Sequence, residues 1–159
     1  MAGTTIYRTA VAPEWIDYNG HLRDAYYAVV LSLAVDALMD ERLGLDPAYR
    51  ERTRCTLYSL EMHIHWLREV KADAMLEVDV HVLAHDAKRL HLGLDMRVAG
   101  SDGVSAAAEY MLLHYRQGEN AGAATFPPEV VAAIGTLAAA SAGADWPGPR
   151  SRALTLAKR

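Results

Sequence analysis

Apolar and polar positions repeat with two different periods along this chain. Residues 4–11 (TTIYRTAV) are rich in β-branched and aromatic side chains and are followed by Pro13, which predicts a first strand and a turn. From His21 the apolar positions recur at steps of three and four residues until Gly44, which predicts a helix. The predicted stripe consists of Tyr26, Val29, Val30, Leu33, Ala34, Ala37 and Leu38. Because the opposite face is also largely apolar, we expect this helix to be buried inside a wrapping sheet.

A period of two dominates from Cys55 onward. Strands are predicted near 55–66, 76–82, 90–98 and 104–116, with connections at Asp86-Ala87 and at residues 100–103 (GSDG). In the first of these strands, one face is expected to lie on the core, and its members are Tyr58, Leu60, Met62, Ile64 and Trp66. Pro127-Pro128 is expected to open a short helix that ends near Ala140.

The order of these elements is a strand, a long buried helix and four antiparallel strands. This order predicts an α+β fold in which an antiparallel sheet wraps around a long central helix. We expect one domain over residues 1–140 and a C-terminal tail, 141–159, that is extended or partly disordered.

Composition narrows the function classes. A formal charge of −4 argues against a nucleic-acid partner, and no apolar run approaches the roughly 20 residues of a membrane span. The N-terminus has no basic leader before an apolar stretch, and Cys55 is the single cysteine, so we expect a cytoplasmic protein with a buried bystander thiol. Glu61, His63 and His65 alternate on one strand face, but we interpret them as a polar face at an interface or cleft and expect no metal and no cofactor.

The most informative segment is residues 11–27, VAPEWIDYNGHLRDAYY. It resembles the active-site motif of the 4-hydroxybenzoyl-CoA thioesterase-like hotdog enzymes, and the resemblance extends over residues 4 to about 117. It implies a hotdog fold, thioester hydrolysis, catalytic roles for Asp17, Gly20 and His21, and a substrate contact from Tyr27. The chain departs from the common pattern at Trp15, where many members carry a second Asp, and at Arg23-Asp24, where many carry two Asn.

The residue types fit thioester chemistry. Hydrolysis needs a nucleophile or an activated water, together with donors for the oxyanion that develops on the carbonyl. Asp17 could attack directly or deprotonate water, and helix N–H groups near Gly20 to Asp24 could bind the oxyanion. In the alternative interpretation, Asp17 only caps the helix and Gly20 is an ordinary turn glycine. Glu61 is the second candidate for acid/base work.

The substrate prediction also depends on a resemblance. Residues 15–40 and 56–70 are similar to the thioesterases of bacterial carnitine degradation, which act on betainyl-CoA. A trimethylammonium group requires aromatic faces, since it cannot donate hydrogen bonds. Aromatic residues that could supply these faces are Trp15, Tyr18, Tyr26, Tyr58 and Trp66, and Trp15 and Tyr18 are nearest to Asp17 in sequence. Lys88 and Arg89 are the residues that the resemblance favours for the CoA phosphates, ahead of Arg68 and Lys71.

The sequence leaves other functions open. A general short-chain or aromatic acyl-CoA thioesterase, or a non-catalytic acyl-CoA-binding module, would carry the same fold. In either case a single sheet leaves its edges exposed, so we expect a homodimer or homotetramer with the site between subunits.

Overall fold

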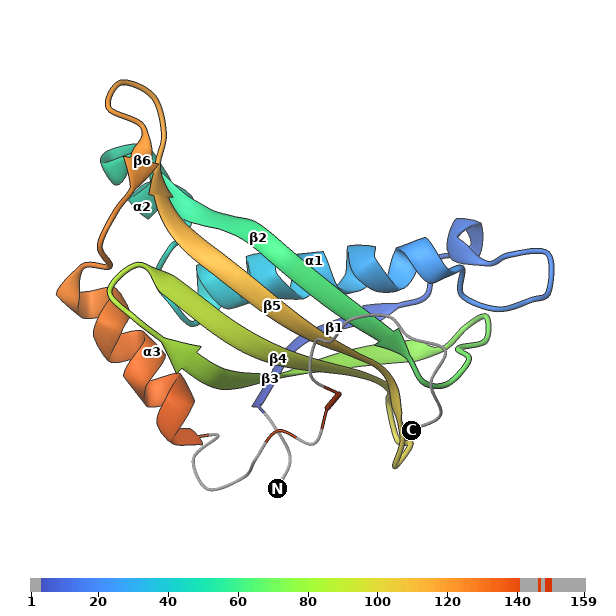
Figure 1. The fold of residues 1–159 in the computed structure, drawn as a ribbon. Coiled ribbons are helices and arrows are strands. Elements are labelled where there is room, and N and C mark those ends of the chain that lie inside the picture. Colours follow the sequence, from blue (N-terminus) through green and yellow to red (C-terminus); the bar gives the residue numbers. More distant parts are fainter. Residues whose placement is uncertain (1–3, 141–145, 147, 150–159) are drawn as a thin grey trace, which may run out of the picture.

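The computed structural model describes residues 4–140, 146, 148 and 149. Its elements are β1 (Thr4–Ala10), the 3-10 helix η1 (Pro13–Trp15), α1 (Asp24–Glu41), α2 (Pro47–Thr53), β2 (Cys55–Trp66), β3 (Met75–His85), β4 (Arg89–Val98), β5 (Val104–Arg116), β6 (Gly122–Ala123) and α3 (Pro128–Ala140). The strands form one antiparallel sheet in the order β1-β3-β4-β5-β2, with β6 paired to β5. Figure 1 shows this sheet curving past α1, with α3 beside β3. The predicted α+β arrangement is confirmed.

The core lies between α1 and the inner face of the sheet. Alternate residues of β3, β4 and β5, such as Val78, Leu92 and Tyr110, are buried there against Leu31 and Leu38 of α1. Truncating a fully buried leucine such as Leu92 to alanine would cost about 2–5 kcal/mol. No helix among the described residues is both long and apolar enough to cross a membrane.

The start of α1 differs from the prediction. His21 and Leu22 are extended and pair with Lys71 and Ile16 in isolated antiparallel bridges, so the helix begins at Asp24 rather than His21. The N–H groups of Leu22 and Arg23 donate to Val70 O (2.8 Å) and Trp15 O (2.9 Å), and these bonds hold the backbone out of the helix. The segment around Asp17 is therefore a hairpin loop before the helix.

Two predicted core faces are partly exposed. Val29 and Leu33 of α1 are 39% and 37% exposed, whereas the neighbouring Val30 and Ala34 are buried. On β2 the predicted core face holds only in part, since Ile64 packs against the core whereas Leu60 and Trp66 are 55% and 56% exposed. An irregularity between Ser59 and Glu61 interrupts the alternation, and β2 is one of the two edge strands in the order β1-β3-β4-β5-β2. Periodicity could not distinguish an edge strand from a central one.

The outer face of the sheet carries a buried tryptophan from beyond α3. The indole of Trp146 lies against Gly93, where a Cβ atom would come within 2.5 Å of the ring. Its Nε1–H donates to Asp95 Oδ1 (3.0 Å), and Asp95 Oδ2 lies 3.3 Å from His81 Nε2. The rest of the predicted tail lies outside the described residues, except for Gly148 and Pro149.

Candidate active site and a second, basic cavity

Asp17 stands on a tight hairpin loop just before α1. Ile16 pairs with Leu22, and the Asp17 N–H donates to His21 O (2.8 Å). The loop closes when the Gly20 N–H donates to Asp17 O (3.1 Å), with Gly20 at φ +80°. Because this left-handed conformation strains other residues, glycine is needed at position 20 for the turn itself.

The Asp17 carboxylate is held ionised by its own loop. Its Oδ1 accepts hydrogen bonds from the N–H groups of Asn19 (2.8 Å) and His21 (3.2 Å). The His21 bond is the main reason that the pKa of Asp17 lies below its ordinary value. The helix N-cap position belongs to Arg23, so the alternative in which Asp17 caps α1 does not hold. Its second oxygen, Oδ2, accepts no hydrogen bond from the described residues and is available to a ligand.

A cavity of about 410 Å³ opens beside this carboxylate at the N-terminal end of α1. Its lining residues are Asp17, Tyr18, Asn19, His21, Leu22, Arg23, Asp24, Tyr27, Trp66 and Glu69. Trp66 reaches the helix start, with its Nε1–H 3.3 Å from Asp24 O. Burial raises the pKa of the Tyr27 hydroxyl, whose oxygen lies 3.4 Å from Arg68 O. The structure thus brings together five predicted residues: Asp17, Tyr18, His21, Tyr27 and Trp66.

Other predicted site residues lie elsewhere. Trp15 and Tyr26 stack on each other, with ring centroids 5.6 Å apart, and neither lines the cavity. Glu61 lies on the other face of the sheet, where its Oε1 is 2.8 Å from His63 Nε2. Within one chain, Glu61 therefore does not meet Asp17.

Glu69 is a cavity residue that the sequence did not indicate. Its Oε2 lies 3.2 Å from His21 Nε2. The contact arises because the segment after β2 pairs with the loop through the His21–Lys71 bridge and the bond from Leu22 N–H to Val70 O. Such long-range pairing leaves no local signal, since almost fifty residues separate the two segments.

Of the backbone N–H groups that were predicted to bind the oxyanion, most are already engaged in other hydrogen bonds. The N–H groups of Gly20, His21, Leu22 and Arg23 all donate to partners within the chain. The Asp24 N–H is the donor of this stretch without a partner among the described residues. It lies at the positive end of the α1 dipole, where an oxyanion is favoured.

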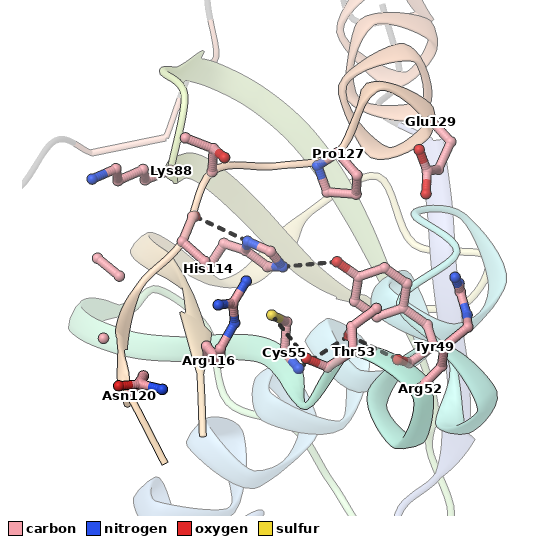
Figure 2. A pocket seen from close by; sticks show the side chains of 14 residues that line it. Tyr49, Arg52, Thr53, Cys55, Lys88, His114, Arg116, Asn120, Pro127 and Glu129 are labelled. Atoms are coloured by element: carbon pink, nitrogen blue, oxygen red, sulfur yellow. Dashed lines mark hydrogen bonds between the residues drawn. The ribbon is translucent and has the colours of Figure 1, made fainter. Parts of the chain in front are cut away.

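A larger, basic cavity of about 550 Å³ lies near the other end of α1. Figure 2 shows Arg52 of α2, Lys88 of the β3–β4 connection and Arg116 at the end of β5 around it, with Glu129 as the one carboxylate of its lining. Lys88 is therefore placed among cations from three separate segments. Such clusters bind phosphate well.

The side chain of Arg89, the residue after Lys88, lies outside the basic cavity. Its Nε and Nη2 both donate to Asp86 Oδ2, at 2.8 and 2.6 Å, and the side chain borders a different hollow. Backbone donation from Lys88, followed by the Arg89 side chain, lowers the pKa of Asp86 to about 2. The charge of Arg89 is thus already matched.

A buried histidine supports the wall of the basic cavity (Figure 2). His114 Nδ1 lies 3.0 Å from Ala124 O, and Nε2 lies 3.0 Å from the Tyr49 hydroxyl. Burial lowers the pKa of His114, so the ring is neutral. Nδ1 then carries the proton toward the carbonyl, and Nε2 accepts from Tyr49. Cys55, also buried as predicted, lies at the same cavity.

Comparisons with known proteins identify the family and the fold. The family model described as the thioesterase-like superfamily matches residues 11–134. The chain is 46% identical to the betainyl-CoA thioesterase of Pseudomonas aeruginosa, over 86% of this chain and 84% of that protein. It is 39% identical to the L-carnitine dehydrogenase/betainyl-CoA thioesterase of Agrobacterium fabrum, over 89% of this chain and 29% of that protein. A Staphylococcus aureus protein solved in complex with CoA superposes with a TM-score of 0.86 at 25% identity, covering 98% of both chains.

Proposed function

The chain belongs to the thioesterase-like superfamily, and from this premise we propose that it hydrolyses betainyl-CoA to betaine and CoA. The observation that carries the proposal is the ionised carboxylate of Asp17, which lines a cavity at the N-terminal end of α1. The same hotdog fold and the identity to a betainyl-CoA thioesterase support the substrate class.

The proposed reaction consumes one water and releases a thiol. Asp17 Oδ2 either attacks the thioester carbonyl carbon, forming an anhydride that water then opens, or removes a proton from the attacking water. In both routes the carbonyl oxygen becomes an oxyanion, which the Asp24 N–H can stabilise, and the C–S bond then breaks to release CoA. The reaction needs no cofactor beyond the CoA moiety of the substrate, and we place it in the cytoplasm.

The acyl end of the substrate fits the cavity around Asp17. In betainyl-CoA the quaternary nitrogen is one methylene from the carbonyl carbon, so it must lie in the same cavity. Tyr18, Tyr27 and Trp66 line that cavity and can present ring faces to the cation. Trp15 and Tyr26 also remain substrate-binding predictions, although they stack on each other and do not line this cavity.

The CoA end fits the basic cavity. We assign the phosphates to Lys88, with Arg52 and Arg116, because three cationic side chains line that cavity. The contribution of Arg89, which the sequence also favoured, is expected to be small because Asp86 binds it twice.

Within one chain, the Asp17 cavity and the basic cavity lie too far apart to bind the two ends of one substrate. β2 has Cys55 at the basic cavity and Trp66 at the Asp17 cavity. Its 12 residues extend over about 36 Å. If the β2 edges of two subunits pair antiparallel, the Cys55 end of one strand lies beside the Trp66 end of the other. The composite site would then take Asp17 from one subunit and the basic cavity from its partner.

The β2 edge has the properties of such an interface. Tyr58, Leu60 and Met62 are exposed apolar side chains on a strand with an unpaired edge, and Val29 and Leu33 of α1 are exposed as well. An edge of this kind is prone to pair with another strand. We therefore propose a homodimer as the minimal active unit, and light scattering distinguishes it from a homotetramer.

A thiol-release assay across a panel of acyl-CoAs tests the function. We expect betainyl-CoA to give a higher kcat/KM than acetyl-CoA and benzoyl-CoA. Equal rates across the panel would indicate a general thioesterase. CoA binding without thiol release from any member would indicate a non-catalytic module and overturn the proposal.

A further inference from the structure

We infer that Glu69 is a specificity-determining residue that selects acyl groups carrying a positive charge, an inference that rests on the proposed betainyl-CoA thioesterase function. The residue lies in the connection between β2 and β3 and lines the Asp17 cavity. Nothing in the reaction at Asp17 requires a second carboxylate at this position.

The backbone fixes Glu69 beside the catalytic loop. On the residue that follows it, Val70 O accepts the Leu22 N–H (2.8 Å), and Lys71 bridges His21. These bonds hold the base of the Glu69 side chain, while 75% of the side chain itself remains exposed. Glu69 can therefore move toward a ligand without a change in the fold.

The three carboxylates that line the cavity, Asp17, Asp24 and Glu69, have different partners. Asp17 is the reacting group, and Asp24 Oδ1 accepts the Ala25 N–H (2.8 Å) at the helix start. Glu69 contacts an imidazole, His21, at 3.2 Å, and an imidazole carries a full charge only when protonated. Glu69 has no lysine or arginine partner among the described residues, and it lines the cavity beside the aromatic side chains of Tyr27 and Trp66, with Arg23 in the same lining.

The ligand chemistry explains why a carboxylate is useful here. A trimethylammonium group has no hydrogen to donate, so aromatic faces and a nearby negative charge are the interactions open to it. The attraction depends on charge rather than on shape. Because Glu69 is exposed, solvent screening limits the selectivity that it provides to roughly threefold to fivefold.

The experiment compares two substrates of the same shape. In 3,3-dimethylbutyryl-CoA a neutral tert-butyl group replaces the trimethylammonium of betainyl-CoA. We would measure kcat/KM for both with wild type, Glu69→Gln and Glu69→Lys. Glu14→Gln serves as the matched control, since Glu14 is an exposed carboxylate in η1 that does not line the cavity.

We expect Glu69→Gln to lower the betainyl-to-neutral ratio roughly threefold to fivefold and Glu69→Lys to lower it further. The rate on the neutral substrate and both rates of Glu14→Gln should stay near wild type. An equal loss on both substrates would show a structural role through His21 and overturn the inference, as would an unchanged ratio. A wild-type ratio near one would instead overturn the betainyl-CoA proposal itself.

Discussion

The two cavities of this chain have opposite charge and are built differently. The cavity around Asp17 has three carboxylates, from Asp17, Asp24 and Glu69, against the single arginine Arg23 among its described lining residues, and it is formed mostly by a loop and a helix start. The basic cavity collects Arg52, Lys88 and Arg116 from three segments around a buried histidine. A substrate with a cationic acyl group at one end and phosphates at the other is complementary to this pair. The comparison shows how a chain with a net charge of −4 can still offer a local site for polyphosphate.

The largest expected effect is at the acidic end. Asp17→Asn should lower kcat at least about 1000-fold, because an amide can neither attack the carbonyl nor accept a proton from water. The asparagine retains an oxygen for the Asn19 and His21 N–H groups, so the loop should keep its shape. Single-turnover thiol release measures the loss, and calorimetric CoA binding should be unchanged. Retained hydrolysis would overturn the assignment of the reacting carboxylate to Asp17.

A smaller effect is expected at the basic end. Lys88→Met and Arg116→Met should each raise KM for the acyl-CoA about tenfold, since each removes one charge-assisted contact to phosphate. Thioesters of N-acetylcysteamine lack the nucleotide, so their hydrolysis should not change. Arg89→Met is the matched control and should leave KM nearly unaffected, because Asp86 already neutralises Arg89. Equal effects of Lys88→Met and Arg89→Met would remove the assignment of the basic cavity to CoA.

Mixing subunits tests whether the two ends work together across an interface. A 1:1 mixture of Asp17→Asn with the Lys88→Met/Arg116→Met double variant should recover about a quarter of wild-type activity at low substrate. Half of the randomly mixed dimers are mixed pairs, and each has one intact site of two. If each chain held a complete site, mixing would restore nothing, and the rate would remain the average of the two separate variants.

The smallest expected effect is that of pH on stability. His114 at the basic cavity should respond to pH in the neutral range, whereas Asp17 should not. Burial lowers the folded-state pKa of His114 below its ordinary value of 6.5. The unfolded chain then binds the proton more readily, so stability is complete above about pH 6.5 and declines as pH falls below it. Urea unfolding at pH 7.5 and 5.5 measures this slope, and His114→Gln should flatten it. The carboxylate of Asp17, with its lowered pKa, should stay ionised over the same range.

The comparison also shows which predictions depended on local information. The strand at residues 104–116, the helix near Pro128 and the hairpin at residues 100–103 follow from short-range periodicity and turn residues, and all of them are found. The segment with Asp17 and Gly20 was identified through its resemblance to a known motif, whereas its hairpin shape was not predicted, because the distant residues Val70 and Lys71 help to hold it. The exposed face of β2 was not predicted, because edge position and the irregularity after Ser59 depend on the neighbouring strand.

By itself, the sequence determined most of the elements and the core-facing alternation of β3 to β5, and it singled out the carboxylate at position 17, whose reactivity stays a prediction. These features depend on backbone propensity and on contacts between residues close in the chain. The tertiary structure alone decided that Glu69 faces His21 and that Arg52, Lys88 and Arg116 share a cavity. Those neighbours are set by strand register and side-chain packing, which join segments that no local pattern connects.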